Sequence, residues 1–88
     1  MAALTLVLPA YNEEDNLVEA VRQALPHLDA ITPAWEIVLV NDGSTDATGA
    51  LADGLAAESG GRIRVVHLTQ NGGLGAALRA GFSAARGD

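Results

Sequence analysis

The chain has 88 residues, of which 49% are hydrophobic and 18% charged, a composition typical of a globular domain and not of a disordered tail. Eleven acidic residues face five arginines and no lysine, so the formal net charge is −6. That charge argues against gripping a nucleic-acid backbone, which requires clustered cations. The absence of cysteine excludes disulfides and thiolate metal sites.

The first predicted element is a strand over Leu4–Leu8, a short and almost wholly apolar run of the kind found in strands buried on both faces. We expect Pro9 to end it. The N-terminus carries no positive leader, so we expect no secretory signal. No apolar run approaches the roughly 20 residues that span a bilayer, and we expect this segment to be soluble.

A helix is predicted over Glu13–Leu28, because apolar residues recur there at helical spacing with polar residues between them. Its first turn would hold three acids, at positions 13–15, which suit the positive end of a helix dipole. Asn12 is the expected N-cap. Pro26 should bend this helix or end it one turn early.

The second predicted strand is Trp35–Val40, and the polar run Asn41–Asp46 after it is turn chemistry. Ser44 or Thr45 is the expected cap of the next helix, and the glycine pair at 60–61 is its stop signal.

The third predicted strand is Ile63–Leu68, followed by the loop Thr69–Gly73. A third amphipathic helix is predicted over Leu74–Arg86, with Leu78 and Phe82 facing inward.

The predicted order is therefore β-α-β-α-β-α, which defines an α/β fold with a parallel sheet between two helical layers, a Rossmann-like three-layer α/β/α arrangement. Right-handed crossovers place all three strand-to-helix loops at one edge of the sheet. A fourth strand is expected after the third helix, so we interpret the chain as truncated before that strand, part-way through a domain.

These loops carry the chemistry from which a ligand site is predicted. Ionised Glu13 and Asp42 accept hydrogen bonds only, so they suit the N–H groups of a base or the hydroxyls of a ribose. Tyr11 adds a flat ring and a hydroxyl, and the glycines of Asn71–Gly75 let main chain approach a ligand closely. The combination predicts a nucleoside site.

Each candidate also has a structural interpretation. Pro9 can simply stop a strand, Tyr11 can be a packing residue, and Glu13 can complement a helix dipole. For Asp42 a functional role is favoured over a structural one, because a helix could be capped without an acid at the end of the strand.

Two rival motifs are disfavoured. A calcium loop starting at Asp42 would have Ala47 where glycine is expected, and a dinucleotide fingerprint would have Leu78 in place of its third glycine. We interpret His27 and His67 as structural, because neither has a partner nearby in sequence.

The segments VLPAYNEEDNL, WEIVLVNDGSTDAT and NGGLGAALRAGFSAARGD together resemble the N-terminal half of the catalytic domain of family 2 glycosyltransferases, which have a GT-A fold. The resemblance covers Leu4–Asp88. The layout is most similar to the polyprenol-phosphate (dolichol-phosphate) mannosyl- and glucosyltransferase branch.

The resemblance implies transfer of a hexose from a UDP- or GDP-linked sugar to an acceptor. Leu74 stands where many relatives carry Lys or Arg. A leucine at this position is similar to the dolichol-phosphate branch, and this similarity favours a polyprenyl phosphate as the acceptor. A divalent cation, Mg²⁺ or Mn²⁺, is implied, with its ligands beyond Asp88. The residues predicted to bind the nucleotide are Pro9, Ala10, Tyr11, Glu13, Asp42, Gly43, Asn71, Gly72, Gly73 and Gly75.

No catalytic residue is predicted within the chain, and we expect the 88 residues alone to be inactive. The expected location is the cytoplasm. For the full-length protein, a location at the cytoplasmic face of a membrane is the alternative. The alternative hypothesis is a non-catalytic α/β module that binds a nucleotide or a partner.

Overall fold

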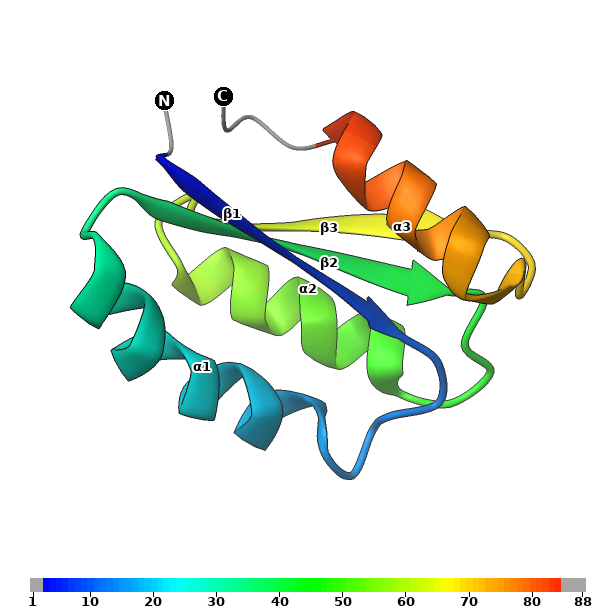
Figure 1. Cartoon of the computed structure of the whole chain (residues 1–88). Coiled ribbons are helices and arrows are strands. Elements are labelled where there is room, and N and C mark those ends of the chain that lie inside the picture. The colour runs from blue at the N-terminus through cyan, green and yellow to red at the C-terminus, as the bar shows by residue number, and fades with distance from the viewer. Residues whose placement is uncertain (1–2, 85–88) are drawn as a thin grey trace.

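The computed structural model describes residues 3–84, apart from the side chains of Leu74, Phe82 and Ala84. Strands and helices alternate as predicted (Figure 1). The elements are β1 (Leu4–Ala10), α1 (Leu17–Ile31), β2 (Trp35–Asp42), α2 (Thr48–Glu58), β3 (Ile63–Leu68) and α3 (Gly73–Ala84). None of the helices in this part of the chain has the length and apolar character needed to cross a bilayer.

The sheet is parallel throughout, with strand order β1-β2-β3, as the alternating pattern predicts. β2 lies in the centre and is buried along its whole length. Its register pairs Val38 with Val7 on one side and with Arg64 on the other. The continuous apolar run of β2 follows from this position, because a central strand has helices over both of its faces.

The side chains of β2 alternate between two cores. Ile37 and Leu39 pack with the cluster that includes Val21 of α1 and Ala52 of α2. Val38 packs with Ala77 of α3 on the other face. Figure 1 shows the result: α1 and α2 lie together below the sheet, and α3 lies above it. The three-layer prediction is confirmed.

The prediction that Pro9 ends the first strand is wrong, because β1 continues through Pro9 to Ala10, opposite Val40 and Asn41 of β2. Among the described residues β1 pairs only with β2, so it is an edge strand. An edge strand tolerates proline, because it has one side on which no partner needs the missing N–H.

The first helix begins later than predicted, at Leu17, and position 16 is its N-cap without a side-chain bond. Asn12, the predicted cap, lies in the loop with a φ of +52°. The carbonyl of Glu13 accepts the N–H of Leu17 at 2.8 Å and forms a turn ahead of the helix. The acids at 13–15 therefore precede the helix instead of forming its first turn.

Pro26 lies inside α1, which continues to Ile31, so the predicted early end is also wrong. Leu28, beyond the proline, is buried in the core at 6% exposure. Packing of this turn against the sheet offsets the hydrogen bond that the proline removes.

The second strand extends two residues further than predicted, to Asp42, and α2 starts at Thr48. Neither Ser44 nor Thr45 caps it. The Asp46 carboxylate instead accepts the N–H of Thr48 at 2.8 Å. The stop signal is confirmed, since the glycines at 60 and 61 directly follow the helix with positive φ.

The third strand has its predicted bounds, and α3 starts one residue earlier than predicted. Leu78 is half-buried. The inward orientation predicted for Phe82, and the helix end predicted at Arg86, lie outside the described residues.

The close packing of α3 on the sheet depends on Gly81. A Cβ there would overlap Val7 Cγ1 and lie 3.2 Å from Val40 Cγ2. Gly54 of α2 offers a matched control, because a Cβ at that position meets nothing within 4 Å.

We predict that Gly81→Ala lowers the free energy of unfolding by about 1–3 kcal/mol through overpacking. Gly54→Ala should raise it by about 0.5–1 kcal/mol, because alanine suits a helix interior better. Urea denaturation of both variants measures the difference. Equal stabilities would show that α3 does not contact the sheet as described.

Candidate functional site

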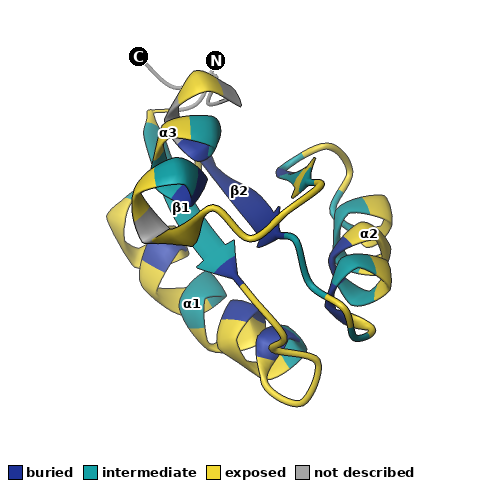
Figure 2. Ribbon diagram, turned by 90° about the vertical axis from the view of Figure 1, so that its right-hand side faces the viewer, coloured by how far each residue is buried: buried dark blue, intermediate teal, exposed yellow. Residues whose placement is uncertain are grey.

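Three loops meet at the carboxyl edge of the sheet, and Figure 2 looks onto this edge. They are loop 1 (residues 11–16, after β1), loop 2 (residues 43–47, after β2) and loop 3 (residues 69–72, after β3). Because the strands are parallel and adjacent, all three loops leave the sheet side by side.

Loops 1 and 2 are joined by reciprocal hydrogen bonds through Asn12. Its main-chain N–H donates to Ser44 Oγ at 3.0 Å, and its Oδ1 accepts the N–H of Thr45 at 2.9 Å. The left-handed backbone of Asn12 turns its main chain and side chain toward the same neighbour, and asparagine tolerates that conformation better than most residues. Sequence reasoning missed this role, because it requires contact over more than 30 residues.

Thr48, at the start of α2, also joins loop 1 to loop 2. Its side chain is fully buried, and its Oγ1 accepts the N–H of Glu13 at 2.8 Å and donates to Asp46 Oδ1. Asp46 Oδ2 accepts the N–H of Glu14 at 3.3 Å. The acidic segment of loop 1 is therefore held by its main chain, which leaves the Glu13 and Glu14 carboxylates exposed.

Asp46 is tuned by these contacts. Burial acts to raise the pKa of its carboxyl group, but the hydrogen bonds from the Thr48 side chain, the Thr48 N–H and the Glu14 N–H outweigh burial. The net result is a pKa below the ordinary value of 3.8.

Loops 2 and 3 approach each other even more closely. Asp42 Oδ1 accepts the N–H of Gly72 at 2.9 Å. Gly43 has a φ of +72°, and a Cβ there would lie 2.5 Å from the carbonyl carbon of Gln70 and overlap Asn71 N. Only glycine combines that backbone with so close a neighbour, so Gly43 determines how near loop 3 can come.

Asp42 itself is buried, with only 4% of its surface exposed. One of its oxygens holds loop 3. Within residues 3–84 no hydrogen bond is found to its second oxygen, Oδ2, which leaves that atom to accept a bond from a ligand.

A pocket of about 140 Å³ lies at the end of β1, next to loop 1. Three of the predicted site residues line it: Pro9, Ala10 and Glu13. Sequence reasoning missed the other lining residues, which were assigned to the core strand or to helix periodicity: Leu8, Asn16, Leu17 and Ala20.

The remaining predicted site residues also lie at this edge. Tyr11 is 45% exposed, directly after the pocket residue Ala10. Asn71, Gly72 and Gly73 are exposed where loop 3 enters α3, and Gly75 lies in the first turn of that helix. The sheet therefore gathers the ten predicted residues at one edge, and their contact with a nucleotide stays a prediction.

The described residues do not fit a metal ion by themselves. Within residues 3–84 no three His, Asp or Glu side chains are grouped so that they could hold one. The divalent cation implied by the family resemblance remains a prediction for ligands outside this part of the chain.

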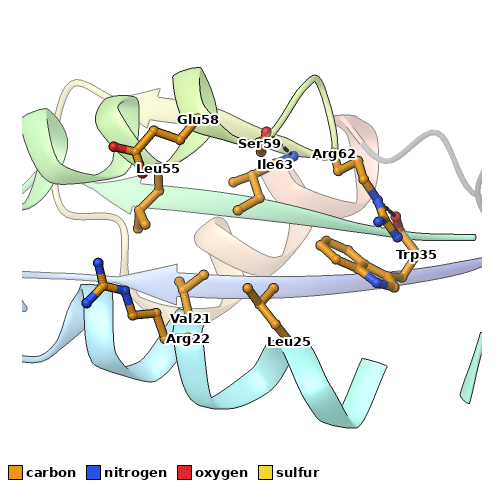
Figure 3. Close-up of a pocket in the computed structure, with 9 residues that line it drawn as sticks. All are labelled: Val21, Arg22, Leu25, Trp35, Leu55, Glu58, Ser59, Arg62 and Ile63. Carbon is orange, nitrogen blue, oxygen red and sulfur yellow. Dashed lines mark hydrogen bonds between the residues drawn. The ribbon is translucent and has the colours of Figure 1, made fainter. Parts of the chain in front are cut away.

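A larger pocket, of about 240 Å³, lies near the amino ends of β2 and β3, between α1 and α2 (Figure 3). There the Arg62 guanidinium stacks 3.6 Å from the centre of the Trp35 ring and donates to the carbonyl of Pro33 at 2.5 Å. The indole N–H of Trp35 donates to Asp29 at 2.6 Å. These polar groups hold the chain together, so they do not indicate a ligand site.

An open parallel sheet with helices on both faces and its loops gathered at the carboxyl edge is a Rossmann-like α/β arrangement, a class whose ligands bind in the crevice at that edge. The family follows from comparison of sequences. Residues 5–88 match glycosyl transferase family 2, and the chain belongs to that family.

Two relatives are both named undecaprenyl-phosphate 4-deoxy-4-formamido-L-arabinose transferase. The protein from Pseudomonas fluorescens (strain SBW25) is 39% identical over 85 residues, and the one from Salmonella choleraesuis (strain SC-B67) is 36% identical over 85 residues. Each comparison covers 97% of this chain, but only 25% and 26% of the respective relative. The chain thus spans about a quarter of their length, and the names of these relatives fit the polyprenol-phosphate branch that the sequence resembles.

The role of Thr48 generates a test. We predict that Thr48→Val lowers the free energy of unfolding by about 1–2 kcal/mol, because two hydrogen bonds are lost at a buried position. It should also speed hydrogen exchange of the Glu13 amide. Thr48→Ser loses a methyl group but keeps the hydroxyl, so it should leave that amide protected. Equal exchange in the two variants would contradict the assigned bond.

The lowered pKa of Asp46 predicts that the stability of the fold depends on pH. Because its folded-state pKa lies below the unfolded value, its contribution to stability is complete above about pH 4 and is lost as the pH falls through the folded pKa. Asp46→Asn should therefore be less stable than the wild type at pH 6, and the gap should narrow toward pH 2. Thermal denaturation at constant ionic strength measures this, and a gap that does not change with pH would refute it.

Proposed function

We propose that this chain supplies the donor-nucleotide half of a glycosyltransferase that moves a sugar from a nucleotide diphosphate to a polyprenyl phosphate. The observation that carries the proposal is the hydrogen-bonded union of loops 1, 2 and 3 at one edge of the sheet, in a chain that belongs to glycosyl transferase family 2.

The geometry supports a nucleoside at this edge. The pocket beside β1 is mainly apolar and has the Glu13 carboxylate in its lining, so it suits a flat base that offers N–H donors. Asp42 Oδ2 offers a second acceptor at the end of the neighbouring strand. Both groups only accept hydrogen bonds when ionised, so they suit a nucleoside and would repel a bare phosphate.

The diphosphate needs a different environment, because the chain has a net charge of −6. Main-chain N–H groups at the start of α3 supply a positive field, and the Arg79 guanidinium lies near the same turn, 3.4 Å from where a Cβ on Gly75 would be. Gly72 and Gly73 let a ligand approach these groups without a Cβ in the way. The bound cation implied by the family would neutralise the remaining charge of the diphosphate.

The acceptor is proposed from the relatives, whose names specify undecaprenyl phosphate. The same names specify an arabinose derivative as the sugar, whereas the sequence resemblance suggested a hexose. A lipid-phosphate acceptor would bring the full-length protein to the cytoplasmic face of a membrane.

Nucleotide binding by the full-length protein tests the proposal. We expect calorimetry with UDP or GDP in the presence of Mn²⁺ to detect binding. Asp42→Asn keeps the size of the side chain but removes its charge, so it should weaken affinity about tenfold or more. Glu58→Gln, at the opposite edge of the sheet, should bind as the wild type does.

The outcomes separate the hypotheses. Transfer from a nucleotide sugar to undecaprenyl phosphate, with hexose and pentose donors compared, would establish the enzyme. Nucleotide binding without transfer to any polyprenyl phosphate would support the non-catalytic module instead. Absence of binding to both nucleotides would overturn the proposal.

A further inference from the structure

Beside the loops, a line of polar groups runs from α2 across β3 to the end of β2. Asp53 Oδ1 lies 2.9 Å from His67 Nε2, and His67 Nδ1 lies 3.0 Å from Asn41 Nδ2. The other end of the same amide, Asn41 Oδ1, accepts the N–H of Ser44 at 3.1 Å. Asn41 and His67 are register partners in the parallel ladder, which keeps the pair together.

The donors and acceptors in this line can be assigned from chemistry. The amide oxygen of Asn41 is taken by the Ser44 N–H, so the amide nitrogen faces His67 and can only donate. His67 Nδ1 must therefore accept, which places the ring proton on Nε2, pointing at the Asp53 carboxylate. The arrangement requires a neutral ring in that one tautomer.

Space for the pair is provided by α2. A Cβ on Gly49 would lie 2.8 Å from Asn41 Nδ2 and 3.5 Å from His67 Cε1. Gly49 belongs to the first turn of the helix, where its φ is not positive, so no backbone strain calls for glycine there. The glycine is needed because the Asn41–His67 pair lies against it.

The line continues into the candidate site. The N–H of Ser44 donates to the Asn41 side chain. The hydroxyl oxygen of Ser44 in turn accepts the N–H of Asn12. Asn41 is also the immediate neighbour of Asp42, which holds Gly72 of loop 3. The Asn41 amide is thus linked by hydrogen bonds to loops 2 and 1, and its chain neighbour Asp42 holds loop 3.

We propose that His67 and Asn41 are positioning residues for the nucleotide site: the neutral His67 ring, held by Asp53, fixes the Asn41 amide and with it the conformation of loop 2. The inference rests on the proposed function and adds two residues that do not touch the ligand. His67 was interpreted as structural without a partner nearby in sequence, and the fold supplies its partners from α2 and β2.

Protonation of His67 would break the line. A second ring N–H would face the Asn41 NH₂ group, donor against donor, and the amide would have to turn its oxygen toward the ring. The Ser44 N–H would then lose its acceptor. The charged group that faces the ring is Asp53 of α2, and from β2 the ring faces Asn41, which is neutral.

The first test concerns the proton and needs no nucleotide. Nitrogen NMR of the full-length protein at pH 8 should show His67 protonated at Nε2 and bare at Nδ1. A wild-type ring protonated at Nδ1 would overturn the proposal.

The second test concerns the loop and the ligand. His67→Leu should speed exchange of the Ser44 and Asn12 amides and weaken nucleotide affinity about fivefold to tenfold. His67→Asn keeps an acceptor near the position of Nδ1, so it should recover most of both losses. His27→Leu, a change to the other histidine, on α1, should alter neither.

The two proposals fail separately. Wild-type binding of UDP or GDP that is unchanged in His67→Leu would refute the positioning role and leave the proposed function standing. If the wild type bound neither nucleotide, the proposed function would fall. The ring tautomer and the amide exchange of Ser44 would then still decide whether His67 positions loop 2.

Discussion

The structure depends on one constraint, the parallel pairing of β2 between β1 and β3. Every residue of β2 is buried, and its alternate side chains form the two cores on which α1, α2 and α3 pack. Parallel neighbours also end at the same edge, so the pairing that builds the core brings loops 1, 2 and 3 together. Core and site are therefore consequences of the same register.

Main-chain groups carry most of the contacts that join the loops. The hydrogen bonds are donated to side chains of another loop, of a strand end or of the first residue of α2, and the donors are the N–H groups of Asn12, Glu13, Glu14, Thr45 and Gly72. In this arrangement short polar side chains accept the hydrogen bonds that hold the loops together. It leaves the Tyr11 ring and the Glu13 carboxylate exposed at the rim, where a ligand can reach them.

The sequence predicted the order of elements and the parallel sheet well, because continuous apolar runs such as Trp35–Val40 and glycine stops are local signals. It failed where tertiary contact decides. Pro9 continues a strand because that strand is at an edge, and Asn12 adopts a positive φ because it bonds loop 2. The buried hydroxyl of Thr48 has no local signal, since its partner Glu13 is 35 residues away.

The sequence predicted which loops form the candidate site. It did not predict which residues of these loops hold the loops together. Asp42 was predicted to accept hydrogen bonds from a base or ribose, and in the structure it is buried and one of its oxygens holds loop 3. His67 has no partner nearby in sequence, and register places it opposite Asn41. Register between strands is a property of the folded sheet, and so these pairings appear only there.

The most direct measurement of the central claim is a map of the backbone amides that shift in NMR spectra when UDP or GDP is added to the full-length protein. The account predicts that within this chain the shifts concentrate in loops 1, 2 and 3, with Asn12, Ser44 and Gly72 among them. Shifts confined to the Trp35–Arg62 pocket at the opposite edge of the sheet would contradict it.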